Sequence, residues 1–164
     1  MDLQETLNLQ LAEPVAKALL ELYVLLQTTP KACLSYVEGG AYGGGAGLAL
    51  ACDFSIAGRG AQIAFPEIQK GIIPAFIVGL QKVPPALLLS GRPVKPSQLL
   101  NASGGETLAL TVAEQFLQME PHAFAATKQL LSQGLRARLE ALLPLHIASK
   151  TSVEAQQCLK LFLN

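Results

Sequence analysis

The sequence has no tryptophan, only two histidines and only three cysteines in 164 residues. The histidines, His122 and His146, lie in stretches of helical periodicity and have no second ligand three or four residues away, which is the spacing that zinc pairs on a helix use. We therefore expect no metal site. No C-x-x-C pair is present, so we expect ordinary buried thiols at the three cysteines, which are Cys33, Cys52 and Cys158.

An excess of either charge is also missing, since 12 Lys and Arg balance 12 Asp and Glu. No basic stripe interleaved with aromatic residues is present, so we expect no nucleic-acid partner. No apolar run reaches about 18 residues without glycine, proline or charge, so we expect no membrane segment. The opening residues, MDLQETLNLQ, are acidic and amide residues that a signal or transit peptide avoids, and we therefore expect a cytoplasmic protein.

What is present is a composition with 51% hydrophobic and 15% charged residues, enough for the core of one globular domain. Helical and strand patterns alternate up to about residue 105, and only helical patterns follow in 106–164, so we predict an α/β body and then a helical region. The expected helices are 9–27, 43–52, 106–119, 121–133, 135–149 and 152–163; the expected strands are 32–39, 54–58 and 61–65, before an ordered loop at 66–76.

Three consecutive glycines, Gly43, Gly44 and Gly45, open the second expected helix. Each costs roughly 0.5–1 kcal/mol relative to alanine inside an element, so the bare backbone needs a reason. The first N–H groups of a helix have no helical partner and favour negative charge, so a phosphate or an oxyanion could bind there. Neither phosphate-loop spacing is present, which leaves an oxyanion site or a close crossing of helices.

The segment 33–75, CLSYVEGGAYGGGAGLALACDFSIAGRGAQIAFPEIQKGIIPA, resembles the signature region of the crotonase superfamily, the enoyl-CoA hydratase and isomerase proteins. Strand, G-G-G helix opening, Cys-Asp and the P-E-x-x-x-G-x-x-P-A loop follow in the same order. LLLSGRPV, AATKQLL and SVEAQQCLKLFL extend the similarity more loosely over nearly the whole chain. The resemblance implies a crotonase-like ββα superhelix, the ClpP/crotonase fold, with an α-helical C-terminal region.

The resemblance also implies a site. The backbone N–H of Gly44 would donate to a thioester carbonyl as half of an oxyanion hole that stabilises an enolate. Glu67 would be the catalytic glutamate that carries a proton at the α, β or γ carbon, although a lone loop glutamate is ordinarily a solvated carboxylate. Coenzyme A would be part of the substrate, with no further cofactor. The implied substrate-binding residues are Gly43, Gly45, Ile73, Pro74, Ala75 and Phe76.

Gly47 departs from the two-glutamate hydratases, which carry a second glutamate at this position. Two carboxylates can hold a water for addition to a double bond, whereas one carboxylate can move a proton between two carbons. The departure favours isomerisation. It does not exclude hydration, because hydratase-like relatives of the methylglutaconyl type resemble this G-G-G-x-G-L form.

The opening MDLQE resembles the end of the family's A-G-x-D-L motif, whose alanine supplies the other oxyanion N–H. That alanine and the family's first strands would precede Met1, so we expect a core in 1–105 that is incomplete at its N-terminus and shortened between Ala75 and Ser90. A fragment, an internally shortened paralogue and a sequence with unobserved pieces all fit this pattern.

The function expected from the resemblance is that of an enoyl-CoA hydratase or isomerase, a lyase or isomerase of fatty acid metabolism acting on an acyl-CoA thioester. The alternative is a non-catalytic or truncated paralogue that assembles with intact subunits. In both cases the helical region 106–164 is expected to mediate oligomerisation, because relatives typically form trimers or pairs of trimers through it. We expect a homotrimer or homohexamer.

Overall fold

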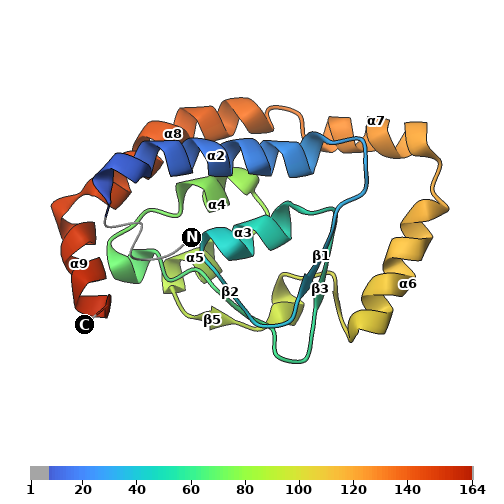
Figure 1. Cartoon of the computed structure of the whole chain (residues 1–164), viewed down its shortest axis with the longest axis horizontal. Coiled ribbons are helices and arrows are strands. Elements are labelled where there is room, and N and C mark those ends of the chain that lie inside the picture. The colour runs from blue at the N-terminus through green and yellow to red at the C-terminus, as the bar shows by residue number, and fades with distance from the viewer. Residues whose placement is uncertain (1–7, 164) are drawn as a thin grey trace.

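The computed structural model describes residues 8–163, which wind into a ββα superhelix with long helices along one side (Figure 1). A leading helix, α2, comes first, and each turn of the superhelix then gives one strand to each of two small sheets. The elements of the first turn are α2 (Leu9–Thr28), β1 (Leu34–Val37), β2 (Gly40–Tyr42) and α3 (Gly44–Ala51). The later elements of this α/β part are β3 (Phe54–Ala57), β4 (Gln62–Ala64), η1 (Ile68–Lys70), α4 (Ala75–Leu80), α5 (Pro85–Ser90), β5 (Pro93–Val94), η2 (Pro96–Gln98) and β6 (Ala102–Ser103).

The two sheets have the orders β1-β3-β6 and β2-β4-β5. All pairs are parallel except β4 with β5. Leu34 pairs with Phe54, and Gly40 pairs with Gln62. The expected short strands before and after the Gly58–Gly60 turn therefore exist as β3 and β4, but each pairs with the strand one turn earlier rather than with the other. The crotonase-like α/β fold is confirmed.

One expected strand and one expected loop differ from the structure. The strand expected over 32–39 is shorter, and the chain then forms a second strand, β2, within the glycine-rich stretch. Glycine has low strand propensity, so no local pattern indicates β2; its pairing with β4 creates it. The loop expected over 66–76 ends early, because α4 begins at Ala75.

The helical C-terminal region is confirmed as α6 (Glu106–Leu117), α7 (Pro121–Leu131), α8 (Leu135–Thr151) and α9 (Val153–Leu163). Helix α8 lies alongside α2 and packs on α4 (Figure 1). The contact with α4 includes the His146 imidazole, which stacks on the Phe76 ring at a centroid distance of 4.1 Å. The division of the chain at residue 105 and the role of these helices in assembly stay predictions.

A mostly buried ion pair joins α7 to the end of α3. The Lys128 ammonium lies 2.7 Å from the Asp53 carboxylate, with side-chain exposures of 6% and 17%. The same carboxylate oxygen accepts the Cys33 N–H at 2.7 Å. Lys128 also donates to the carbonyl of Lys31 at 2.9 Å. Asp53, the aspartate of the Cys-Asp pair in the signature segment, therefore has a structural role. The three cysteines are free but only partly buried, so the expectation of buried thiols was wrong in degree.

Residues 1–7 and 164 lie outside the described part, and with them the segment MDLQE that resembles the A-G-x-D-L motif. Between residues 8 and 163, no helix combines the length and the apolar character that a membrane crossing needs. In the same range, no three His, Cys, Asp or Glu side chains gather as they would around a metal ion.

Replacing Asp53 with alanine should destabilise the fold by about 3 kcal/mol, because it leaves the Lys128 ammonium buried without its counter-charge. Chemical denaturation measures the loss. Glu13→Ala is the matched control, since it breaks the Glu13–Lys17 pair, in which both side chains are 60% exposed. That control should leave the free energy of unfolding nearly unchanged. Equal losses in both variants would show that the buried pair has no special role.

Acid should weaken the fold through His146. Burial lowers the pKa of His146 from 6.5 to about 3, so the folded chain keeps this imidazole neutral while the unfolded chain protonates it. The free energy of unfolding therefore falls as the pH drops from about 6.5 to about 3. Denaturation curves of His146→Leu should show a shallower fall over this window. Parallel pH profiles for the two proteins would contradict the assignment.

Candidate active site

The first turn of α3 is built on a backbone that requires glycine. Gly43 has φ +53° and ψ −121°, a conformation that L side chains rarely adopt, and an added Cβ would lie 2.8 Å from Oε1 of Glu67. The Gly43 N–H donates to the Ala64 carbonyl at 2.9 Å, and the Gly43 carbonyl accepts the Gly47 N–H at 2.9 Å. The N–H groups of Gly44 and Gly45 begin the helix, where no helical partner is available.

Glu67 stands directly against this turn. It follows β4 and Pro66, and its own carbonyl accepts the N–H groups of Lys70 and Ile72, both at 2.9 Å, which fixes the tight turn around it. Its Oε2 atom is buried and has no hydrogen-bond partner. Burial raises the pKa of Glu67, and the Lys70 and Lys150 charges partly oppose that rise. A carboxyl with a raised pKa accepts a proton more readily than an exposed glutamate does, and it can return that proton later.

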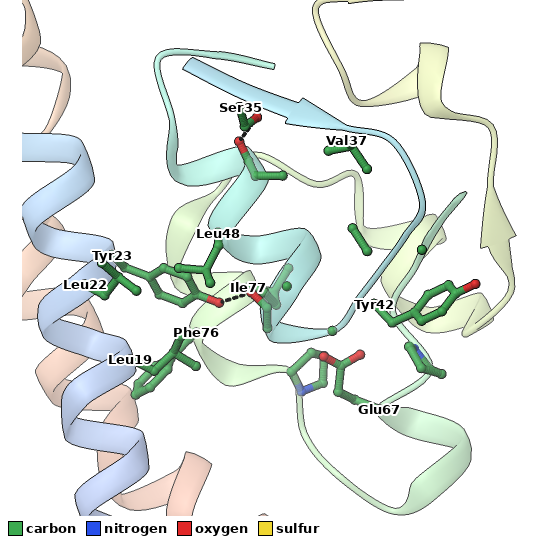
Figure 2. Close-up of a pocket in the computed structure, with 18 of the residues that line it drawn as sticks. Leu19, Leu22, Tyr23, Ser35, Val37, Tyr42, Leu48, Glu67, Phe76 and Ile77 are labelled. Atoms are coloured by element: carbon green, nitrogen blue, oxygen red, sulfur yellow. Dashed lines mark hydrogen bonds between the residues drawn. The ribbon is translucent and has the colours of Figure 1, made fainter. Parts of the chain in front are cut away.

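A cavity of about 950 Å³ lies between the glycine turn, Glu67, α2 and α8 (Figure 2). Its wall is largely apolar, with side chains that α2 and α4 supply. Figure 2 shows Leu19, Leu22, Leu48, Phe76 and Ile77 around it. The apolar wall and the size of the cavity suit a flexible apolar ligand. The Glu67 carboxylate and the N-terminus of α3 form the polar end of the cavity.

Most of the residues expected from the sequence meet at this cavity, and two do not. Ile73 is 41% exposed and Ala75 is buried in the core, and neither is part of the cavity wall. Ala75 is the first residue of α4. The residues that do line the cavity are Gly43, Gly44, Gly45, Glu67, Pro74 and Phe76.

Three further polar side chains reach the cavity from helices distant in sequence. Tyr23 on α2 donates its hydroxyl to the Gly44 carbonyl at 3.1 Å. His146 and Lys150 on α8 are 6% and 5% exposed. Neither ring nitrogen of His146 has a hydrogen-bond partner. Burial lowers the pKa of Lys150, and the Glu67 charge partly restores it. The sequence analysis missed these three residues. The i, i+4 spacing of His146 and Lys150, which places both on one helix face, is the feature of the sequence that could have indicated a shared site for those two.

Gly47, the position of the missing second glutamate, faces a filled space. A Cβ there would overlap the Tyr23 hydroxyl oxygen and the Cδ1 atom of Ile77, and would lie 2.9 Å from Cζ of Tyr23. A side chain at position 47 would therefore require the side chains of Tyr23 and Ile77 to shift. The site therefore has one carboxylate at the turn and a phenol where a second side chain would enter.

Comparison with known proteins agrees with this geometry. Residues 1–86 match the family described as enoyl-CoA hydratase/isomerase. The chain is 33% identical over 159 residues to the enoyl-CoA isomerase/hydratase fer4 of Mycosarcoma maydis, covering 84% of this chain and 57% of that protein. It is 31% identical over 157 residues to the 2,3-dehydroadipyl-CoA hydratase of Escherichia coli K12, covering 85% and 61%. The chain thus spans less than two thirds of either relative.

Solved structures show the same fold. An enoyl-CoA hydratase from Mycobacterium avium superposes with a TM-score of 0.84 at 22% identity, over 94% of this chain and 68% of that one. The enoyl-CoA hydratase from Bacillus halodurans gives 0.78 at 24% identity, over 98% and 74%. Fold and sequence lead to the same assignment: this chain belongs to the enoyl-CoA hydratase/isomerase family.

Proposed function

We propose that the chain acts on an acyl-CoA thioester in fatty acid metabolism in the cytoplasm, by stabilising a thioester enolate at Gly44 and transferring a proton through Glu67. The observation that carries the proposal is the Glu67 carboxyl, whose Oε2 atom is buried without a hydrogen-bond partner beside the open N-terminus of α3. A buried carboxylate oxygen without a hydrogen-bond partner is costly in a purely structural role, and a substrate proton would give that oxygen a partner.

The chemistry follows from the geometry of the turn. When Glu67 removes a proton from the α or γ carbon, the C–H bond breaks, an O–H bond forms on the carboxyl, and negative charge moves onto the thioester oxygen. The N–H of Gly44 and the positive end of the α3 dipole stabilise that charge. Return of the proton from Glu67 to a different carbon moves the double bond. Gly43, Gly45, Pro74 and Phe76 shape the space for the thioester and the acyl chain, which brings its own coenzyme A and needs no other cofactor.

Isomerisation is favoured over hydration at this site. A second carboxylate helps to hold and activate a water for hydration, and the side chains of Tyr23 and Ile77 fill the space that such a group would need at position 47. The phenol of Tyr23 in that space is no substitute as a base, because burial and the Glu67 charge raise its pKa.

A second candidate function is that of a non-catalytic paralogue that assembles with intact subunits. The observation in its favour is a series of large apolar side chains on the surface of the C-terminal helices, which a partner would cover. The most exposed are Leu117, Leu130, Leu131, Val153 and Leu161. A homotrimer or homohexamer built through α6–α9 would bury such residues in either function.

Replacing Glu67 with glutamine should lower the rate of acyl-CoA α-proton exchange by about 10²–10⁴, because the amide cannot carry the proton. Loss of deuterium from an α-deuterated acyl-CoA, followed by NMR, measures the exchange. Glu114→Gln, an exposed change on α6, is the control and should keep the wild-type rate. Undiminished exchange in Glu67→Gln would remove Glu67 from the mechanism. No exchange in the wild-type chain would favour the non-catalytic candidate.

The wild-type chain should convert a β,γ-enoyl-CoA to its α,β isomer faster than it hydrates the α,β-enoyl-CoA of the same acyl length. The reason is the single carboxylate at the turn. Absorbance of the conjugated thioester follows both rates in matched assays. Hydration that exceeds isomerisation would show that water is activated without a side chain at position 47.

A further inference from the structure

The glycine turn at the start of α3 needs external restraints. Three glycines in sequence populate many backbone conformations, so an N–H group in such a turn keeps one direction only if neighbours hold it. Two backbone hydrogen bonds restrain Gly43, through Ala64 and Gly47. A side chain contributes a third bond, from the Tyr23 hydroxyl to the Gly44 carbonyl, 3.1 Å apart and drawn as a dashed line in Figure 2.

Tyr23 is itself held rigidly. The residue is fully buried, and its ring meets the Phe76 ring edge to face, with centroids 6.2 Å apart and an interplanar angle of 84°. Because α2 and α4 hold the ring on different sides, the hydroxyl has little freedom to leave the Gly44 carbonyl. The phenol therefore acts as a fixed donor between α2 and the turn.

The same hydroxyl closes the wall of the cavity beside position 47. The space that a side chain at Gly47 would occupy contains the Tyr23 oxygen together with Cδ1 of Ile77. On the other side of the turn, a Cβ on Gly43 would lie 2.8 Å from the Glu67 carboxylate oxygen Oε1. The turn is thus enclosed between a phenol and a carboxylate, and the cavity opens between them.

We propose that Tyr23 is a positioning residue that holds the peptide between Gly44 and Gly45 and so keeps the neighbouring N–H groups directed at the cavity, while it occupies the space in which a second carboxylate would stand. The restraint on the turn is a property of the fold. Its consequence for the thioester carbonyl rests on the proposed function.

The test removes only the hydroxyl, with Tyr23→Phe, which keeps the ring and its contact with Phe76. The matched control is Gln27→Met. The Gln27 amide donates to the Ala51 carbonyl, so it links the same two helices at the opposite end of α3 and lies outside the cavity wall. Both variants lose one hydrogen bond from a side chain of α2 to a carbonyl of α3.

Hydrogen exchange of the Gly43 and Gly47 amides in the unliganded chain, read by NMR, tests the restraint directly. Tyr23→Phe should speed both by about tenfold, as expected for one lost hydrogen bond, and Gln27→Met should leave them unchanged. Unchanged exchange in Tyr23→Phe, or equal acceleration in both variants, would overturn the proposal. This readout does not depend on any reaction.

The catalytic consequence is tested on acyl-CoA. Tyr23→Phe should lower kcat for α-proton exchange about tenfold with KM within about twofold, since the restraint matters most as charge develops on the oxygen. The carbonyl stretch of a bound ¹³C-labelled thioester should move to higher frequency than in the wild type, and Gln27→Met should change neither quantity. If wild-type exchange is absent, the proposed function fails and the amide readout alone decides the role of Tyr23. If exchange is present and kcat and the stretch are unaffected in Tyr23→Phe, the positioning role is wrong.

Discussion

The site depends on one close approach, that of the Glu67 carboxylate to the backbone of Gly43. A Cβ at Gly43 would lie 2.8 Å from the carboxylate oxygen, and the backbone there has a positive φ, so only glycine satisfies both demands. The approach places an anionic group beside the N-terminal end of α3 without contact between side chains. The ββα superhelix makes it possible, because β2 leads into the turn and its neighbour β4 leads into Glu67.

The helices around the superhelix supply the other polar side chains near Glu67 and so determine how the groups at the site ionise. Helix α2 covers α3 and brings the Tyr23 hydroxyl to the turn, and α8 brings His146 and Lys150 to the other side of the cavity. Each of these side chains is buried, so the protein environment governs its ionisation. The pKa of Glu67 rises through burial and that of Lys150 falls for the same reason, while their mutual attraction limits both changes. The result is a carboxyl that is suited to exchange a proton.

Much of the polar structure outside the cavity is architectural. The Asp53–Lys128 pair ties α7 to the end of α3 and, through the Cys33 N–H, to the start of β1. It anchors the end of α3 that is opposite to the glycine turn. Helix α3 is therefore restrained at both ends, by an ion pair at one and by the hydrogen bonds of Tyr23 and Ala64 at the other. A short helix with three glycines in its first turn has little stability of its own, which explains why it is held at both ends.

The sequence by itself determined the local parts of this protein. Apolar periodicity predicts α2 and the four C-terminal helices, and the resemblance of 33–75 to a known signature assigns Gly44 and Glu67 to one site. The sequence does not predict strand β2, because its glycines show no strand pattern and the strand forms only through pairing with β4. Only the tertiary structure decided which side chains line the cavity. Tyr23 and His146 are part of its wall, and Ile73 and Ala75 are not. The physical reason is that periodicity reports which face of a helix is apolar, whereas the neighbour that this face meets depends on the packing of segments more than 20 residues apart, as between Tyr23 and Gly44.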